Sequence, residues 1–167
     1  MKRIVLLVLI VVSYQAGAQV ALHHGSFAYS KTVKMEGTKS ELYAKAQGWV
    51  NNNFDAQKDE IRFTEGNHNF IEIHGTWYHE LDGKPNAINY TYTIEILGGI
   101  YRETLKELSY HAKGRDIPYE SKKVPSKKQV LLDTNVQMIS LSKDFKAFIE
   151  TEMFADNNGN NSDVVNP

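Results

Sequence analysis

The sequence contains no cysteine, and this absence excludes several kinds of site at once. Without a thiol there is no disulfide, no catalytic cysteine, no zinc site built on thiolates and no lipid attached to a cysteine behind a leader. After the N-terminal region, no segment is apolar over the about 20 residues that a membrane-crossing helix needs. We therefore expect a domain without a transmembrane segment, whose stability comes from its hydrophobic core.

An excess of charge of one sign is also missing. The 19 basic and 20 acidic residues give a formal net charge of −1, so the chain has no overall positive field to attract nucleic acid. It also has no phosphate-cradling glycine loop, no dinucleotide fingerprint, and neither a G-x-S-x-G nor an H-E-x-x-H motif. We assign no catalytic residue, no metal and no cofactor, and we expect no nucleic-acid partner.

The first 18 residues have the three zones of a secretion signal. Lys2 and Arg3 precede an unbroken apolar run over residues 4–12, and small residues occupy 16–18. The apolar run is too short to hold the protein in a bilayer as a stop-transfer helix. We predict cleavage near Ala18 and a mature protein that is periplasmic or secreted.

The remaining periodicities predict a single α+β domain over residues 26–154, followed by a disordered tail over 155–167. A capping box at Thr38 and Glu41 predicts the start of one helix, and a second helix is predicted over about 135–153. The predicted strands cover residues 26–33, 60–64, 70–79, 87–97 and 100–110. We expect two layers in the order β-α-β-β-β-β-α, with an antiparallel sheet of about five strands and both helices on one face.

Two adjacent glycines predict how the last two strands pair. Gly98-Gly99 suits a two-residue hairpin turn, because both positions tolerate a positive φ. The turn fixes the register, so that Glu95 lies opposite Arg102, and Glu103 lies opposite Ile94 on the apolar face. A carboxylate is out of place there. We expect Glu103 to lie near a margin of the sheet or beside a partner that the local pattern does not reveal.

Two short motifs resemble those of a known family. They are Ser40-Glu41-Leu42-Tyr43 followed by Ala46, Trp49 and Phe54, and Gly99-Ile100-Tyr101-Arg102 at the hairpin. They are similar to an exported Bacteroidetes family that has a domain of unknown function and a fold like the TATA-box-binding protein. The resemblance covers roughly residues 26–110. It implies a fold and an exported setting, and no activity or catalytic residue.

The fold's namesake binds DNA, and we do not expect this role to transfer. A fold does not determine a function, and the predicted protein is exported. The sheet face that should remain open also carries two carboxylates, Glu72 and Glu95.

The strand over residues 70–79 carries the candidate site. Alternation places its polar residues, together with His68, on the side opposite the predicted helices. We predict a non-enzymatic module that binds a protein or a small ligand through this open face, or that self-associates through it. The residues predicted to make the contact are Phe70, Glu72, His74, Tyr78 and Arg102.

Two alternatives stay open. Glu72 and His74 stand two residues apart on one strand face, which suits a metal-dependent or acid–base hydrolase with His68 as a third member. Glu72 and His74 side chains that point apart, or that a helix covers, would exclude this hydrolase. The second alternative is a structural adaptor of the cell envelope, which docks through the basic loop over residues 113–128.

Overall fold

The computed structural model describes residues 20–159 except 24, 82 and 113, so the predicted signal over 1–18 and the last part of the predicted tail lie outside it. The elements are β1 (Ala21–His23), β2 (Ser26–Lys34), α1 (Lys39–Asn53), β3 (Glu60–Thr64), β4 (Asn69–Leu81), β5 (Lys84–Ile96), β6 (Ile100–Ala112), β7 (Arg115–Pro118) and α2 (Lys127–Gly159). Among the described residues, no helix combines the length and the apolar composition that a membrane crossing requires.

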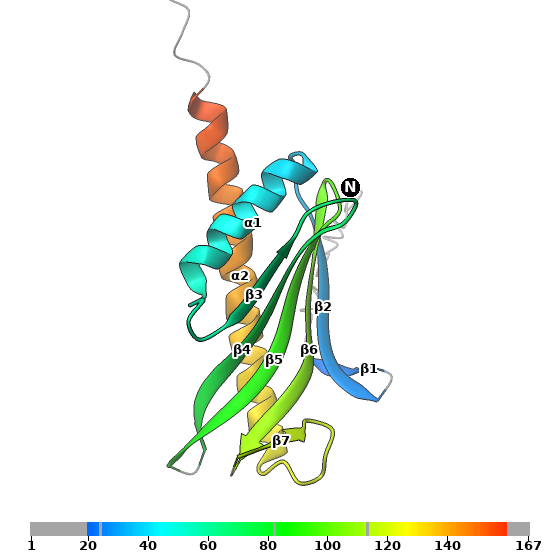
Figure 1. The fold of residues 1–167 in the computed structure, drawn as a ribbon, viewed down its shortest axis with the longest axis vertical. Helices are drawn as coiled ribbons and strands as arrows, with labels where there is room; N and C mark the ends of the chain where they lie inside the picture. The colour runs from blue at the N-terminus through cyan, green and yellow to red at the C-terminus, as the bar shows by residue number, and fades with distance from the viewer. Residues whose placement is uncertain (1–19, 24, 82, 113, 160–167) are drawn as a thin grey trace, which may run out of the picture.

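The strands form one antiparallel sheet in the order β1-β2-β6-β5-β4-β3, with β7 paired to β6. The predicted α+β class and two-layer plan are confirmed, but the sheet has seven strands where about five were predicted. The two additional strands have only 3 and 4 residues, too few to show an alternating pattern in the sequence. The strands β4, β5 and β6 run side by side along the molecule, and α2 crosses behind them (Figure 1).

Both helices pack on the same face of the sheet, as predicted. Trp49 of α1 is fully buried, with its ring 4.7 Å from that of Phe145 in α2. Phe145 in turn contacts Tyr101 of β6 at 4.9 Å between ring centroids, so helix, helix and sheet meet in one core. The predicted capping box of α1 is present, with Thr38 and Glu41 each bonded to the backbone of the other. Among the residues that the structure describes, no helix lies on the opposite face of the sheet.

The second helix is longer than predicted at both ends. It begins at Lys127 because Val130, Thr134 and Met138 already form a buried stripe at four-residue spacing. It continues to Gly159, past residue 155, where the disordered tail was predicted to begin.

The β5–β6 hairpin follows the predicted register. Gly98 and Gly99 have φ values of 66° and 67°, and Glu95 pairs with Arg102. Glu103 pairs with Ile94 as predicted, but the expectation that it lies near a sheet margin is wrong. It lies inside the sheet, between β2 and β5, and its exposed fraction is 0%.

The surroundings of Glu103 come from distant parts of the chain. Its Oε2 lies 3.5 Å from the hydroxyl of Tyr29, which also donates to Ser142 of α2 at 3.2 Å. Lys31 Nζ donates to the same Ser142 oxygen at 2.9 Å. Burial raises the pKa of Glu103 to about 7, although Ser142 and Lys31 oppose this rise. The helix-covered face therefore contains a carboxyl group that keeps its proton to a higher pH than an ordinary glutamic acid.

Candidate binding face

The face of the sheet opposite the helices is called the open face here. Its residues include Ser30, Thr32, Glu60, Arg62, Thr64, Phe70, Glu72, His74, Thr76, Tyr78, Ala87, Asn89, Thr91, Thr93, Glu95, Arg102, Thr104, Lys106, Glu107, Ser109, His111 and Asp116. The five residues predicted as contacts all belong to it. The face is rich in hydroxyl groups, and its charged residues alternate in sign.

A chain of hydrogen bonds crosses the middle of the open face from β4 to β6, and an ion-pair contact extends it to β3. Glu72 Oε1 lies 3.1 Å from His74 Nε2, and the other ring nitrogen, Nδ1, lies 3.1 Å from the Thr91 hydroxyl. Thr91 donates to Glu107 Oε2 at 2.6 Å. At the other end, Arg62 approaches Glu72 at 3.9 Å. We call Arg62, Glu72, His74, Thr91 and Glu107 the central network.

A β-bulge in β6 brings Glu107 into this network. The register shifts between Asn89 and Thr91, because β6 has one residue more than β5 over that interval. Glu107 takes the left-handed backbone conformation, with a φ of 56°, which is uncommon for a residue other than glycine. The bulge turns its side chain to the open face, next to Thr91. The strained backbone conformation thus positions a carboxylate.

A second network of hydrogen bonds joins the next cross-strand pair along β4 and β5, Thr76 and Asn89. Thr76 donates to Asn89 at 2.9 Å, and Asn89 donates to Asp116 of β7, also at 2.9 Å. Asp116 Oδ1 lies 2.8 Å from His111 Nδ1. We call Thr76, Asn89, His111 and Asp116 the lower network. Side chains from β4, β5, β6 and β7 are therefore joined by polar contacts on the open face.

The remaining predicted residues lie at the two ends of the face. Phe70 is half-buried and pairs with Glu95, which binds Arg102 at 3.1 Å. Tyr78, at the other end, is 77% exposed. His68 lies in the bend before β4, which begins at Asn69, so it does not share the strand of Glu72 and His74 as expected.

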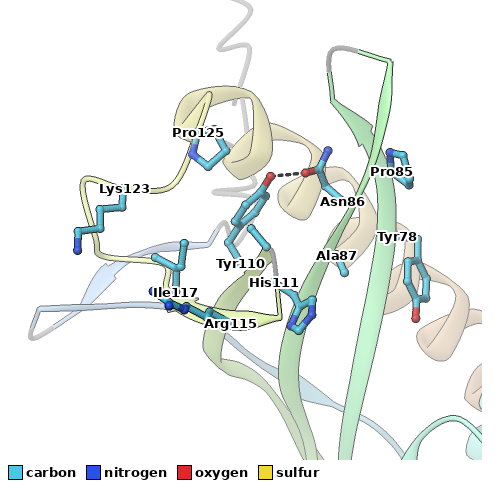
Figure 2. A pocket seen from close by; sticks show the side chains of 11 residues that line it. Tyr78, Pro85, Asn86, Ala87, Tyr110, His111, Arg115, Ile117, Lys123 and Pro125 are labelled. Carbon is cyan, nitrogen blue, oxygen red and sulfur yellow. Dashed lines mark hydrogen bonds between the residues drawn. The ribbon is translucent and has the colours of Figure 1, made fainter.

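A cavity of about 940 Å³ lies at the end of the sheet where the β4–β5 hairpin, β6 and the loop around β7 meet. Figure 2 shows Tyr110 at its centre, hydrogen-bonded to Asn86, with Ile117, Lys123 and Pro125 on the loop side. Tyr78 and His111 link the cavity to the open face, because both line it. The cavity is lined by Tyr78, Pro85, Asn86, Ala87, Tyr110, His111, Ala112, Arg115, Ile117, Lys123 and Pro125.

Sequence reasoning missed three groups of this surface. Alternation placed Thr91 on the polar face. The local sequence did not predict its hydrogen bond to Glu107, because that bond depends on the bulge. The contacts of Asp116 with Asn89 and His111 were not predicted, because β7 is too short to be recognised as a strand in the sequence. The cavity residues of the loop carry no periodic signal, although Pro118 and Pro125 marked the segment as irregular.

The arrangement suits binding better than metal chemistry. Among the described residues, no group of three or more histidine, aspartate or glutamate side chains gathers in a geometry that could hold a metal ion. The expected trio of His68, Glu72 and His74 is therefore not assembled. Glu72 and His74 do contact each other and no described helix covers them, so an acid–base pair remains on the face.

Comparison with known proteins places the fold. Residues 29–111 match the model of a domain of unknown function (DUF4468) with TBP-like fold. The crystal structure of a TBP-like protein from Parabacteroides distasonis superposes with a TM-score of 0.68 at 15% identity, over 78% of this chain and 97% of that one. A DUF4468 family protein from Bacteroides ovatus gives 0.54 at 12% identity, over 79% and 88%.

The sequence has no significant match among curated proteins. Identities this low show a shared fold alone, and they bring no activity to this chain. The family resemblance drawn from the helix and hairpin motifs is confirmed. Through residues 29–111, the chain belongs to the family of the domain of unknown function (DUF4468) with TBP-like fold.

Proposed function

We propose that the protein is a non-enzymatic interaction module that binds a partner protein through the open face. The observation that carries this proposal is the preorganisation of the face. Its side chains are already fixed in two hydrogen-bonded networks, and no described helix lies over them. A surface ordered before binding loses little conformational entropy when a partner arrives.

The charges of the face indicate what kind of partner fits. Glu95 is paired with Arg102, and Glu72 lies 3.9 Å from Arg62, so the face presents neighbouring charges of opposite sign rather than a field of one sign. A polar surface of mixed charge suits another protein better than a polyanion. Tyr78, exposed at one end, has the size and the amphipathic ring of a typical anchor residue.

Site-specific photocrosslinking in cells that express the protein tests the proposal. A benzophenone amino acid replaces Tyr78 or Phe70 on the open face, and Leu132 as the control. Leu132 is 56% exposed on α2, so it offers a similarly accessible position away from the face. We expect a discrete crosslinked product from position 78 or 70 and none from 132. A product with twice the mass of the chain would identify the partner as a second copy.

A charge reversal separates specific contact from mere exposure. Arg102→Glu places two carboxylates side by side and should abolish the crosslinked product while leaving the melting temperature nearly unchanged. Equal products from positions 78 and 132, or products that Arg102→Glu does not affect, would contradict binding through the open face.

The hydrolase alternative rests on the contact between Glu72 and His74. Against it, the hydroxyl nearest to His74 belongs to Thr91, whose exposed fraction is 3% and which already donates to Glu107. The 940 Å³ cavity is lined by neither Glu72 nor His74. Hydrolysis of chromogenic esters that is lost in His74→Gln and retained in His111→Gln would favour the hydrolase over the binding module.

We also propose that the protein is exported after cleavage near Ala18. The charged start, the apolar run and the small residues at 16–18 support this proposal. N-terminal sequencing of the protein recovered from the periplasm or the medium should begin at Gln19. Recovery of a chain that starts at Met1 from the cytoplasm alone would contradict export.

A further inference from the structure

The cavity at the end of the sheet has the size and lining of a small-molecule site. Its volume of about 940 Å³ lies within the range of typical ligand pockets, roughly 300–1,000 Å³. Pro85, Ala87, Ala112, Ile117 and Pro125 provide apolar walls. The hydrogen bond between Tyr110 and Asn86 fixes the polar group in the middle of the cavity (Figure 2). Such a lining favours a ligand with an apolar body.

The charges around the cavity are cationic. The two carboxylates of the loop do not line the cavity, since Asp116 contacts His111 and Asn89, and Glu120 accepts the backbone N–H of Phe27. Arg115 and Lys123 line the cavity and are exposed, and neither forms an ion pair with a described residue. An anionic head group would therefore meet cations whose charge is not neutralised.

We propose that this cavity binds a small amphipathic carboxylate. The apolar body lies against Ile117, Ala112 and Pro125, and the carboxylate meets Arg115 and Lys123 at the outer edge. A planar guanidinium matches the two oxygens of a carboxylate, and the long stems of both side chains let their charged ends reach a ligand at the rim. The site shares Tyr78 and His111 with the open face, but Phe70 and Arg102 do not line it, so changes at Arg102 test the proposed protein-binding role separately.

Calorimetric titration with three probes of equal chain length tests the head group. Decanoate and decylamine below their micelle concentrations, and decanol below its solubility limit, are titrated into the mature protein at pH 7.4 and low salt. We expect decanoate to bind at least about tenfold more tightly than decanol, and decylamine to bind least, because the rim is cationic. Equal affinity for decanoate and decanol would overturn the proposal, as would the absence of decanoate binding.

Two variants on the same loop test the location. Arg115→Gln with Lys123→Gln should weaken decanoate binding by about tenfold or more, because the charge-assisted contacts are removed. Lys122→Gln, which removes an exposed charge of the same loop that does not line the cavity, should change the affinity less than about twofold. An equal effect of the two changes would show a general charge effect and no site.

A measurement on the unmodified protein guards against variants that fail to fold. Decanoate should shift the backbone amide NMR signals of Ala87, Ala112 and Ile117, while those of Phe70 and Arg102 stay in place. Shifts confined to another part of the molecule would overturn the proposal. Conversely, Arg102→Glu should abolish photocrosslinking without weakening decanoate binding, so this proposal and the proposed protein-binding function fail separately.

Discussion

Strand β6 carries a glutamate on each of its two faces, and the two side chains have opposite environments. Glu103 points into the core under α2, fully buried, and burial raises the pKa of its carboxyl to about 7. Glu107, four residues later, lies beyond the bulge on the open face, where its side chain is 62% exposed and accepts a hydrogen bond from Thr91. The covered face favours an uncharged carboxyl group, whereas the open face displays carboxylates to solvent.

The difference shows that position relative to the helices, and not residue identity, decides what each carboxylate does. On the covered face, Oε1 of Glu103 and the hydroxyls of Tyr92 and Tyr101 have no hydrogen-bond partner among the described residues, so charge there is costly. On the open face, charged side chains such as Arg102 and Glu107 are accessible to solvent. Stability should therefore respond to changes on the covered face, and recognition to changes on the open face.

The largest expected effect is on the pH dependence of folding through Glu103. Below its ordinary pKa of 4.5, the carboxyl is protonated in both the folded and the unfolded states. Between pH 4.5 and about 7, the folded state keeps the proton and the unfolded state loses it. Each pH unit then lowers the free energy of unfolding by about 1.4 kcal/mol, or about 3 kcal/mol over the interval. Urea unfolding at several pH values measures this loss.

Matched variants assign this loss to the covered face. Glu103→Gln is neutral at every pH, so the loss between pH 4.5 and 7 should shrink by about 3 kcal/mol. Glu107→Gln, the control on the open face of the same strand, should leave it unchanged. The contrast between the faces breaks down if both variants show the same pH profile.

A second prediction concerns the packing of the covered face at Gly75. A Cβ atom there would lie 2.5 Å from the hydroxyl oxygen of Tyr90, whose ring is tilted by 30° to that of Trp77 with 4.1 Å between the centroids. Gly75→Ala should therefore displace the tyrosine and lower the free energy of unfolding by about 1–3 kcal/mol. Tyr90→Val should reduce this penalty in a double-mutant cycle measured by urea unfolding.

Gly48 provides the control for Gly75. Its added Cβ would meet only Phe148 Cζ at 4.0 Å, an ordinary contact. Gly48→Ala lies within α1, where alanine is favoured over glycine by about 1 kcal/mol, so it should be neutral or stabilising. Equal penalties at the two glycines would mean that the close approach of Tyr90 does not limit position 75.

Local patterns predicted the elements whose cause is local. The capping box at Thr38 and the hairpin at Gly98-Gly99 depend on residues within a few positions, and the structure confirms both. The surroundings of Glu103 depend on Tyr29, 74 positions away, and on α2, so the sequence showed only that a carboxylate was misplaced. Long-range contacts, rather than local preference, decide such a position.

The same limit applies to the candidate site. Alternation alone placed Glu72, His74 and Tyr78 on one face. It did not predict the bulge, although the buried positions of β6 change from odd numbers up to Leu105 to even numbers from Leu108, which is the mark of one extra residue. Glu107 was therefore not predicted as a residue of the open face. The cavity was not predicted either, because it forms only where β7 and its loop meet the β4–β5 hairpin.

The central network gives a smaller predicted effect. Thr91→Val keeps the shape of the side chain but removes the hydroxyl between His74 and Glu107, which should cost about 1 kcal/mol in urea unfolding. The ring signals of His74 should shift in the NMR spectrum. Thr93→Val, whose hydroxyl makes only a 3.4 Å contact with the Thr104 carbonyl, should leave both nearly unchanged. Identical results for the two threonines would show that the network does not hold His74.

The smallest effect on stability is expected where the effect on recognition should be largest. Arg102 and Glu95 form an ion pair at 3.1 Å, but their side chains are 46% and 31% exposed, so solvent screens the attraction. Arg102→Gln should lower the free energy of unfolding by about 0.5 kcal/mol or less, with little dependence on salt. In the same protein, photocrosslinking from Tyr78 should fall clearly. A stability loss above about 2 kcal/mol would make Arg102 a structural residue, and the separation between a stabilising face and a recognising face would then fail at the residue where it is sharpest.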